Sequence, residues 1–373
     1  MNHGLHLALE IGSVTTAPVS RPVIEALTEV QVRAAATSQS GFQLKFTIGK
    51  NSEVMRLLSS GYFDPQRRVI IIAIVRGTPH VLMDGVITQQ DLAPSDDAGA
   101  STLTLTGLDL TVHMDFIDLS GLVAYPALTY DLMVLTALAK YAVFGIVPLV
   151  VPSVIPVVSN PLRRYQTHSG TDLAFIRMLA QMAGYVFYLQ PGPQPGMSVA
   201  YWGPEIRQGS PQPTLGINLD AASNVESLSF SYNGLSRQQV VGIVQIPEAR
   251  VPIPVPIPAI TLLKPHLARQ PAVIMKTRNL PLARFDLPTA IQVALAALAG
   301  PADAVTGSGQ IDVLRYGKVL SPRELVTVRG AGAQFNGRYY VTNVTHTISR
   351  GKYTQSFSLV RGGVKSDVSR VDP

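Results

Sequence analysis

Alternating apolar and polar residues mark the first third of the chain as a set of β-strands. Between 42 and 48 the apolar residues fall at every second position, which is typical of a strand with one face in a core and the other in water. The run 69–75 is apolar almost throughout and predicts a strand covered on both sides. Further strands over 81–88 and 102–106, separated by turn signals, complete an antiparallel meander.

The middle of the chain changes to a helical period. Segments 131–143 and 171–183 have helical character, and apolar residues recur at three- and four-residue steps in the second segment. Thr171 or Ser169 can cap that helix, and Gly184 can end it. A strand over 185–189 follows, so this region predicts a small α+β unit inserted after the first β unit.

Strands resume near Asn224 and continue to the end of the chain. Five prolines in 247–258 predict an extended, donor-poor segment, which is either an interface arm or spacer, or an ordered surface loop. A helix is expected over 288–299, since Pro288 suits a first turn. The last strands, 338–348 and 353–361, are expected to form a hairpin.

A faint internal repeat links the two β regions. Val75-Arg76-Gly77 is followed by Asp84-Gly85, and Val328-Arg329-Gly330 is followed by Asn336-Gly337. If one β module was duplicated, Gly85 and Gly337 should occupy equivalent hairpin turns. Chance matches of this size are common, so the sequence leaves duplication and coincidence both open.

These patterns predict a mainly β chain with an α+β insertion. We expect two related antiparallel β-barrel domains and one small α+β domain. The expected boundaries are 1–118 for the first β-barrel domain, 119–216 for the inserted α+β domain, and 217–373 for the second β-barrel domain, which contains the proline-rich segment and one helix.

Composition agrees with a folded chain of many short strands. The chain has 373 residues, of which 46% are hydrophobic and 14% charged, with 30 glycines and 28 prolines. The net charge of +6 is spread along the chain, which favours an ordinary solvated surface over a specific nucleic-acid site. With no cysteine, the chain has no disulfide framework and no thiolate zinc site. Glu10 and the lack of a basic start argue against a secretory signal.

One stretch has the hydropathy of a membrane span. Residues 141–158 are apolar, but Pro148, Pro152 and Pro156 oppose a continuous helix. We therefore expect no membrane span there. The segment is either buried in extended form or lies on a surface that a partner subunit covers.

Candidate catalytic residues do not converge on a motif. No G-x-S-x-G elbow is present, and Ser308 between two glycines is interpreted as part of a turn. Asp109 and Asp115, six residues apart in sequence, could form a carboxylate pair of the kind that glycosidases use, although aspartates at strand ends more often bind backbone donors. Only two of the seven histidines are close in sequence, and none forms H-E-x-x-H; they are His3, His6, His80, His113, His168, His266 and His346. We predict no catalytic, cofactor-binding or metal-binding residues, and no cofactor.

Three separated blocks carry a resemblance to a known family. The first block runs from Arg76 through Asp84-Gly85 to the segment 103–109. The second, 170–187, has an Asp-x-x-Phe helix followed by Gly-Tyr and a strand, and the third covers 320–361. These blocks resemble the tail hub proteins of contractile phage tails and phage-tail-like injection systems, known as the late-control D family, and are also similar to the hub portion of type VI secretion spikes.

The resemblance implies a function without catalytic residues. Such hubs are homotrimers whose two barrels per chain match a six-fold inner tube to a three-fold spike. It implies these partners: a second and third copy, a separate spike protein because this sequence stops at Pro373, an inner tube protein or tube initiator, and other baseplate components. It implies assembly in the bacterial cytoplasm, in a phage tail or phage-tail-like particle, with no specific nucleic acid. The alternative from a different class is a β-scaffold enzyme or carbohydrate-binding module of such a particle.

Overall fold

The computed structural model describes most of the chain. The described residues are 4–49, 51–95, 101–153, 166–236, 238–245, 252–256, 265–273, 276–282, 290, 293–294, 296–297 and 303–366. His3, residues 154–158 of the apolar segment, and the two ends of the proline-rich segment lie outside them. Of the helix expected over 288–299, only positions 290, 293–294 and 296–297 are described, and these are helical.

The first β unit forms one end of a large sheet. Its pairing order is β3-β4-β7-β6-β5-β1-β2. The elements are β1 (Leu5–Gly12), β2 (Thr16–Pro18), α1 (Arg21–Ala26), β3 (Leu27–Ala35), β4 (Gly41–Ile48), α2 (Glu53–Ser59), β5 (Arg68–Val75), β6 (Thr78–Ala93) and β7 (Ser101–Asp109). The alternation in β4 and the two-sided burial of β5 are as the sequence predicts. Phe46, Phe63 and Leu44 lie in the core that these strands share with α2.

The α+β unit follows directly. Strands β11 and β12 form its sheet with β9, which pairs parallel to β12 at the edge. Its elements are a 3₁₀ helix (Leu110–Met114), β8 (Ala124–Tyr125), α3 (Tyr130–Ala139), a 3₁₀ helix (Lys140–Phe144), β9 (Ile146–Val150), β10 (Gln166–Thr167), α4 (Asp172–Ala183), β11 (Val186–Pro191) and β12 (Ser198–Gly203). Thr171 and Gly184 cap α4 as expected: the Thr171 hydroxyl accepts from Ala174 N, and Gly184 takes the left-handed conformation at φ 70°.

The second β unit forms the other end of the large sheet. Its pairing order is β14-β19-β22-β21-β20-β13. The elements are β13 (Gln212–Gly216), a 3₁₀ helix (Asp220–Ala222), β14 (Ser227–Tyr232), β19 (Val305–Asp312), α6 (Val313–Tyr316), β20 (Leu325–Arg329), α7 (Gly332–Phe335), β21 (Gly337–Ser349), β22 (Lys352–Arg361), and the small pair β17 (Gln270–Pro271) and β23 (Gly363–Val364). The predicted hairpin is β21–β22.

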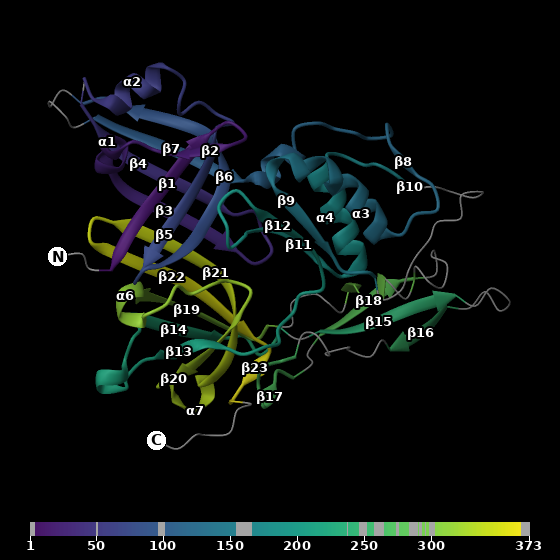
Figure 1. The fold of residues 1–373 in the computed structure, drawn as a ribbon. Helices are drawn as coiled ribbons and strands as arrows, with labels where there is room; N and C mark the ends of the chain where they lie inside the picture. Colours follow the sequence, from purple (N-terminus) through teal and green to yellow (C-terminus); the bar gives the residue numbers. More distant parts are fainter. Residues whose placement is uncertain are drawn as a thin grey trace.

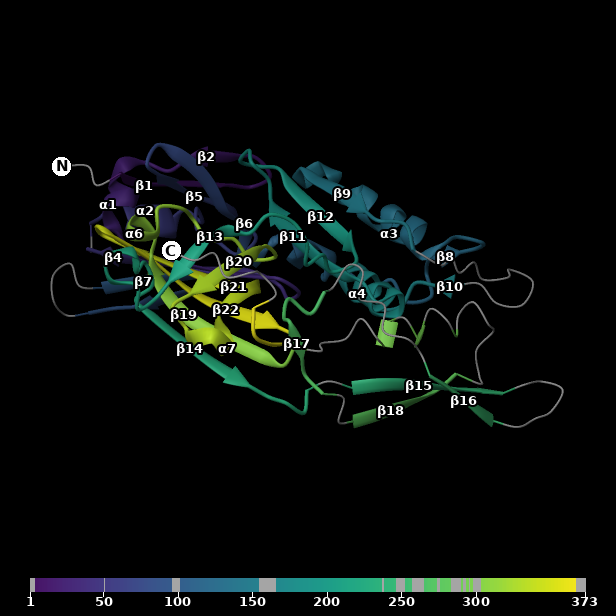
Figure 2. The same cartoon turned by 90° about the horizontal axis from the view of Figure 1, so that it is seen from below.

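A separate three-stranded sheet lies between β14 and β19 in sequence. It contains β15 (Gln238–Gln245), β16 (Pro252–Pro256) and β18 (Lys276–Pro281), so the described part of the proline-rich segment is a strand. Both views place this sheet outside the two β units and next to the α+β unit (Figures 1 and 2).

The two β units are joined into one sheet through β21 and β3. These strands pair antiparallel from Asn343 opposite Ala35 to Ser349 opposite Glu29. Within the described residues the combined sheet has 13 strands, and Figure 1 shows the two units stacked beside the α+β unit. The mainly β fold with an α+β insertion is confirmed, and closure of each unit into a barrel stays a prediction. The three largest cores lie in these three units, while the boundaries at 118 and 216 also stay predictions.

The internal repeat is present in the strand order. The first unit runs β3-β4-β7-β6-β5-β1 across the sheet, and the second runs β14-β19-β22-β21-β20-β13. Strands at the same place in these two lists also come at the same place in the sequence of their own unit. Helix α2 follows β4 just as α6 follows β19. One difference is that β1 is antiparallel to β5, whereas β13 is parallel to β20.

The residues that suggested the repeat are not the equivalent ones. Gly85 lies inside β6, between Val69 and Asp109, whereas Gly337 begins β21 at φ 125°. The expectation of two equivalent hairpin turns is therefore wrong. A Cβ on Gly85 would lie 2.3 Å from Leu108 O, so close backbone approach and not turn geometry requires this glycine.

Candidate assembly interfaces

A buried arginine ties the first β unit to the α+β unit. Arg68 donates to both carboxylate oxygens of Asp84, at 2.8 Å from Nε and 2.7 Å from Nη2. It also donates to the backbone oxygens of Phe144 and Gly196 at 2.9 and 3.1 Å, and Ser198 Oγ donates to Asp84 at 3.2 Å. A charged pair buried this deeply has lost its contacts with water, so hydrogen bonds inside the protein must replace them. These bonds hold the pair in position.

Two further arginines tie the second β unit to the rest. Arg323 donates to the backbone oxygens of Ala35 and Ala36, and its guanidinium lies 3.9 Å from the centre of the Tyr188 ring. Arg207, 4% exposed, binds Asp303 through two hydrogen bonds. Each arginine bridges segments that are far apart in sequence.

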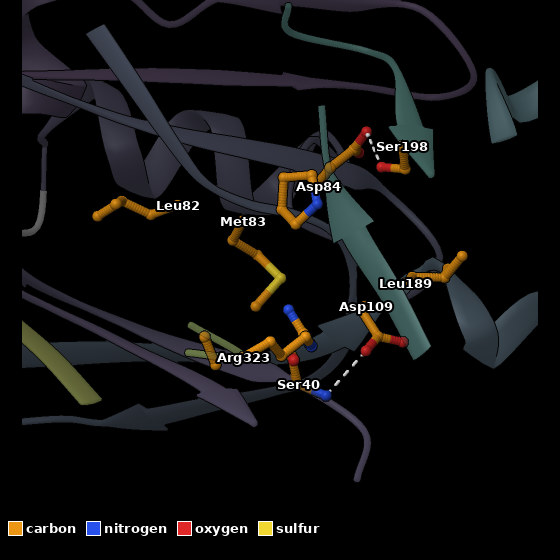
Figure 3. A pocket seen from close by; sticks show the side chains of 10 residues that line it. Ser40, Leu82, Met83, Asp84, Asp109, Leu189, Ser198 and Arg323 are labelled. Carbon is orange, nitrogen blue, oxygen red and sulfur yellow. Dashed lines mark hydrogen bonds between the residues drawn. The ribbon is translucent and has the colours of Figure 1, made fainter. Parts of the chain in front are cut away.

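The point where the three units meet encloses a small cavity. Its volume is about 20 Å³, and its lining includes Asp84 and Asp109 of the first unit, Leu189 and Ser198 of the α+β unit, and Arg323 of the second (Figure 3). That volume holds about one water molecule, far below the several hundred Å³ of a substrate pocket. The junction is therefore a packed joint and not a binding cleft.

The two candidate carboxylates have separate structural roles. Asp109 is 5% exposed and accepts hydrogen bonds from Ser40 N at 2.8 Å and from the backbone and hydroxyl of Thr111. Burial raises the pKa of Asp109, and these hydrogen bonds oppose the rise. Asp115 is exposed and accepts from the Thr171 hydroxyl at the start of α4. Asp109 therefore holds local backbone structure, as the turn interpretation expected, whereas Asp115 binds a side-chain hydroxyl 56 residues away in sequence.

Ser308 does not lie in a turn, which corrects the sequence interpretation. It lies within β19, opposite Ser229 and Ser358, and its Oγ is 3.0 Å from Ser229 Oγ. The flanking glycines are needed for packing: a Cβ on Gly307 would lie 2.7 Å from the Phe230 ring.

Two histidines are buried in cores. His346 Nδ1 lies 2.7 Å from the Tyr353 hydroxyl, and burial, with a smaller effect of His80, lowers the pKa of His346 to about 3. His168 Nδ1 lies 3.0 Å from the Tyr125 hydroxyl. Burial lowers the pKa of His168, against the opposing charge of Asp172.

The other described histidines are dispersed. His6 is exposed on β1, His80 lies on β6, His113 stacks on Phe144 with ring centres 4.3 Å apart, and His266 packs near Gly362. Across the ranges that the structure describes, no group of three histidine or acidic side chains is placed to hold a metal ion.

The α+β unit exposes large apolar side chains. Helix α3 buries Met133 and Val134 yet also presents Leu132 and Leu135 to solvent, at 44% and 38% exposure. The exposed set in this unit is Phe116, Ile117, Leu122, Leu132, Leu135, Val143, Val147, Leu149 and Met197. Val147 and Leu149 belong to edge strand β9, in the described part of the 141–158 segment. Helix α3 contacts β9, and exposed apolar side chains on an edge strand and its neighbouring helix are typical of a surface that a partner covers.

No described helix has both the length and the hydropathy that a membrane crossing requires.

Comparison with solved structures identifies the fold. A tail protein of Neisseria meningitidis MC58 matches with a TM-score of 0.63 at 15% identity, over 97% of this chain and 98% of that chain. A 43 kDa tail protein of the Shewanella oneidensis prophage MuSo2 matches with a TM-score of 0.62 at 11% identity, over 96% and 98%. The chain has the fold of phage tail proteins.

A similar fold occurs in a protein complex of Francisella. A chain of the Francisella PdpA–VgrG complex matches with a TM-score of 0.58 at 10% identity, over 99% of this chain and 54% of that one. By sequence, no protein family model and no curated protein matches. The tail-protein fold predicted from the three sequence blocks is confirmed.

Sequence reasoning missed the buried arginines. Arg68 stands directly before the apolar run of β5, and a charged residue at the head of a fully buried strand is the signal that could have found it. Arg207 and Arg323 have no such local signal, because their partners lie far along the chain.

Proposed function

We propose that this chain is the structural baseplate hub of a contractile injection particle, and that it acts without catalysis. Three copies form a ring in which six similar β units meet an inner tube on one side, and a three-fold spike, carried by a separate protein, binds the other side. The observation that carries the proposal is the shared strand order of the two β units within one chain. A chain with two similar units can match a six-fold partner to a three-fold one by forming a trimer.

Three further features support an assembly role. The arginine joints fix the three units against one another, as a load-transmitting adaptor needs. The apolar surface of α3 and β9 is of the kind buried in obligate complexes. Both tail proteins matched above share the fold over nearly their full length.

The three domains of the proposal are those expected from the sequence: residues 1–118, 119–216 and 217–373. In the particle the two β domains contact the tube protein or tube initiator, and the α+β domain faces other baseplate components. Assembly takes place in the bacterial cytoplasm before the particle acts.

The test is the oligomeric state of the purified chain. Light scattering at concentrations up to tens of micromolar should give the mass of a trimer, alone or after addition of the spike protein. Contacts of obligate assemblies bury about 2,000 Å² or more, so the trimer should persist on dilution. A well-folded monomer throughout that range, with and without spike protein, would overturn the hub assignment.

A further inference from the structure

The contact that joins the two β units inside one chain has a counterpart, made of one strand from each unit, that does not form within the chain. Inside the chain, β21 of the second unit pairs with β3 of the first. By strand order, β21 corresponds to β6, and β3 corresponds to β14. A β6–β14 contact of the same kind can form only between two copies that meet head to tail.

The correspondence of β6 with β21 holds residue by residue. The β6–β7 register shifts between Ile87 and Gln89, and the β21–β22 register shifts between Val341 and Asn343. In each strand the residue that has no partner across this pairing is a threonine, Thr88 or Thr342. The Thr88 hydroxyl donates to Thr106 O at 3.2 Å, and the Thr342 hydroxyl donates to Ser358 O at 3.2 Å.

The acceptors of these two bonds complete the match. Thr106 pairs with Gln89, and Ser358 pairs with Asn343. Two bulges of the same kind, each made by a threonine with the same hydrogen bond, place Gln89 at the position of Asn343. Two residues further on, Asp91 is at the position of Thr345.

The correspondence of β3 with β14 follows from the neighbouring strands. Arg33 pairs with Gly41, which pairs with Leu108 of β7. Ser231 pairs with Thr306, which pairs with Val360 of β22. Leu108 and Val360 are equivalent because each lies two residues after the acceptor of the bulge hydrogen bond, Thr106 or Ser358. Ser231 is therefore at the position of Arg33.

Both edges that would meet are open. In the described part of the chain, β5 pairs with β6 only as far as Val86, and the backbone of Ile87 forms hydrogen bonds with Gln66 and Arg67. No described strand pairs with residues 89–93 on the side away from β7. Residues 88–93 are all exposed, and Leu92 is 44% exposed, whereas His346 at the matching position of β21 is 3% exposed. Among the described strands, β14 ends the sheet, and its sequence Ser-Leu-Ser-Phe-Ser-Tyr has neither a charge nor a proline to discourage pairing.

We infer that β6 of one copy pairs antiparallel with β14 of a second copy of this chain, with Asp91 opposite Ser231 and Leu92 opposite Phe230. The inference rests on the proposed ring and specifies its contact. It repeats between copies the junction in which Thr345 faces Arg33 and His346 faces Val32 within one copy. The sheet then continues from copy to copy, and heterologous contacts give a ring when the rotation between neighbouring copies closes, as the proposed trimer requires.

The charge at the open edge favours this pairing over the symmetric one. Two β6 edges that paired with each other would bring acidic Asp91 side chains together, and like charges on paired strands repel. Opposite Ser231, the Asp91 carboxylate meets a hydroxyl that can donate a hydrogen bond.

Disulfide trapping tests the register, because the chain has no cysteine of its own. Within the chain, Ala36 N donates to Thr342 O, so Arg33 and Thr345 form a pair without mutual hydrogen bonds, the closer of the two antiparallel pair types. Asp91→Cys and Ser231→Cys should therefore reach disulfide distance. Gln90→Cys with Ser231→Cys is the matched control, since Gln90 is also exposed but points to the other face of the sheet.

The variants are co-expressed as full-length chains with distinguishable tags, checked for folding by circular dichroism, and oxidised. The Asp91→Cys and Ser231→Cys pair should give at least about ten times more cross-linked dimer than the control pair, because only the first pair meets disulfide geometry. A single chain that carries both changes should give covalent trimers. Neither single variant should cross-link with itself.

Light scattering on the same samples separates the two proposals. A trimer whose cross-linking is no greater than that of the control, or Asp91→Cys chains that cross-link with themselves, would overturn the β6–β14 contact and leave the hub assignment standing. A folded monomer that never cross-links, with or without spike protein, would overturn both.

Discussion

Arg68 and Asp84 form a buried ion pair joined by two hydrogen bonds, with side chains 5% and 0% exposed. The pair lies at the joint between the first β unit and the α+β unit, since the same guanidinium reaches Phe144 and Gly196. A change at this pair should therefore affect both the stability of the chain and the attachment of the α+β unit.

Asp84→Ala should lower the free energy of unfolding by about 3–5 kcal/mol, because it leaves the Arg68 charge buried without its partner. Glu25→Ala is the matched control: Glu25 pairs with Arg21 at 2.7 Å, but the side chains are 60% and 89% exposed, and the loss should stay within about 0.5 kcal/mol. Urea unfolding followed by circular dichroism measures both. Equal losses for the two variants would show that the buried pair is not a joint.

Regular elements could be predicted because their causes are local. Helix α4 has its cap at Thr171 and its stop at Gly184 within one continuous segment, and β5 is recognised from its unbroken apolar run. The same local logic failed at Ser308. Glycines on both sides suggested a turn, but here they make room for Phe230 and Phe357, which arrive from other strands.

Long-range contacts could not be predicted from local patterns. Arg207 and Asp303 are 96 residues apart, and no spacing rule connects them. The parallel pairing of β13 with β20 joins segments of similar separation. The repeat was visible only faintly, because similar units keep strand order and bulges while their residues diverge. Thr88 and Thr342 match, but Leu92 and His346, four residues further on in each strand, differ in kind.

The purified chain should show no hydrolytic activity on peptidoglycan, simple esters or peptides. Ser308 has another serine as its hydrogen-bond partner, and the Asp109 carboxylate is occupied by Ser40 and Thr111. Neither arrangement activates a nucleophile or provides a free acid–base pair. Turnover that Asp109→Ala or Ser308→Ala abolishes, in a protein that still folds, would contradict the non-enzymatic assignment.

Thr171→Ala should lower the stability of the α+β unit by about 1 kcal/mol or more, because the Thr171 hydroxyl accepts from Ala174 N at the start of α4 and also donates to Asp115. The chain offers its own control in Thr129, which precedes α3 without a side-chain capping bond. Thr129→Ala should change stability by only a few tenths of a kcal/mol. Fluorescence of Trp202, the single tryptophan, reports on this unit during urea unfolding. A Thr129 variant as unstable as the Thr171 variant would show that capping is not the cause.

Acid should destabilise the second β unit through His346. Burial lowers the pKa of His346 to about 3, below the value of about 6.5 for an exposed imidazole in the unfolded chain. The unfolded state therefore binds the proton more readily. As a result, the contribution of neutral His346 to the free energy of unfolding is complete above pH 6.5 and declines as the pH falls toward 3. The slope is about 1.4 kcal/mol per pH unit, or about 2 kcal/mol lost at pH 5.

His346→Gln removes this titration and keeps a group that can bond the Tyr353 hydroxyl, which lies 2.7 Å from Nδ1 in the native protein. The variant should be less stable at pH 7.5, because it leaves the close packing of a buried strand residue imperfect. From pH 7.5 to pH 5, however, it should lose about 2 kcal/mol less than the native chain, since other titrating groups act equally on both proteins. Urea unfolding at the two pH values gives the four free energies needed. If both proteins lose the same amount, His346 is not held neutral by burial in the folded chain.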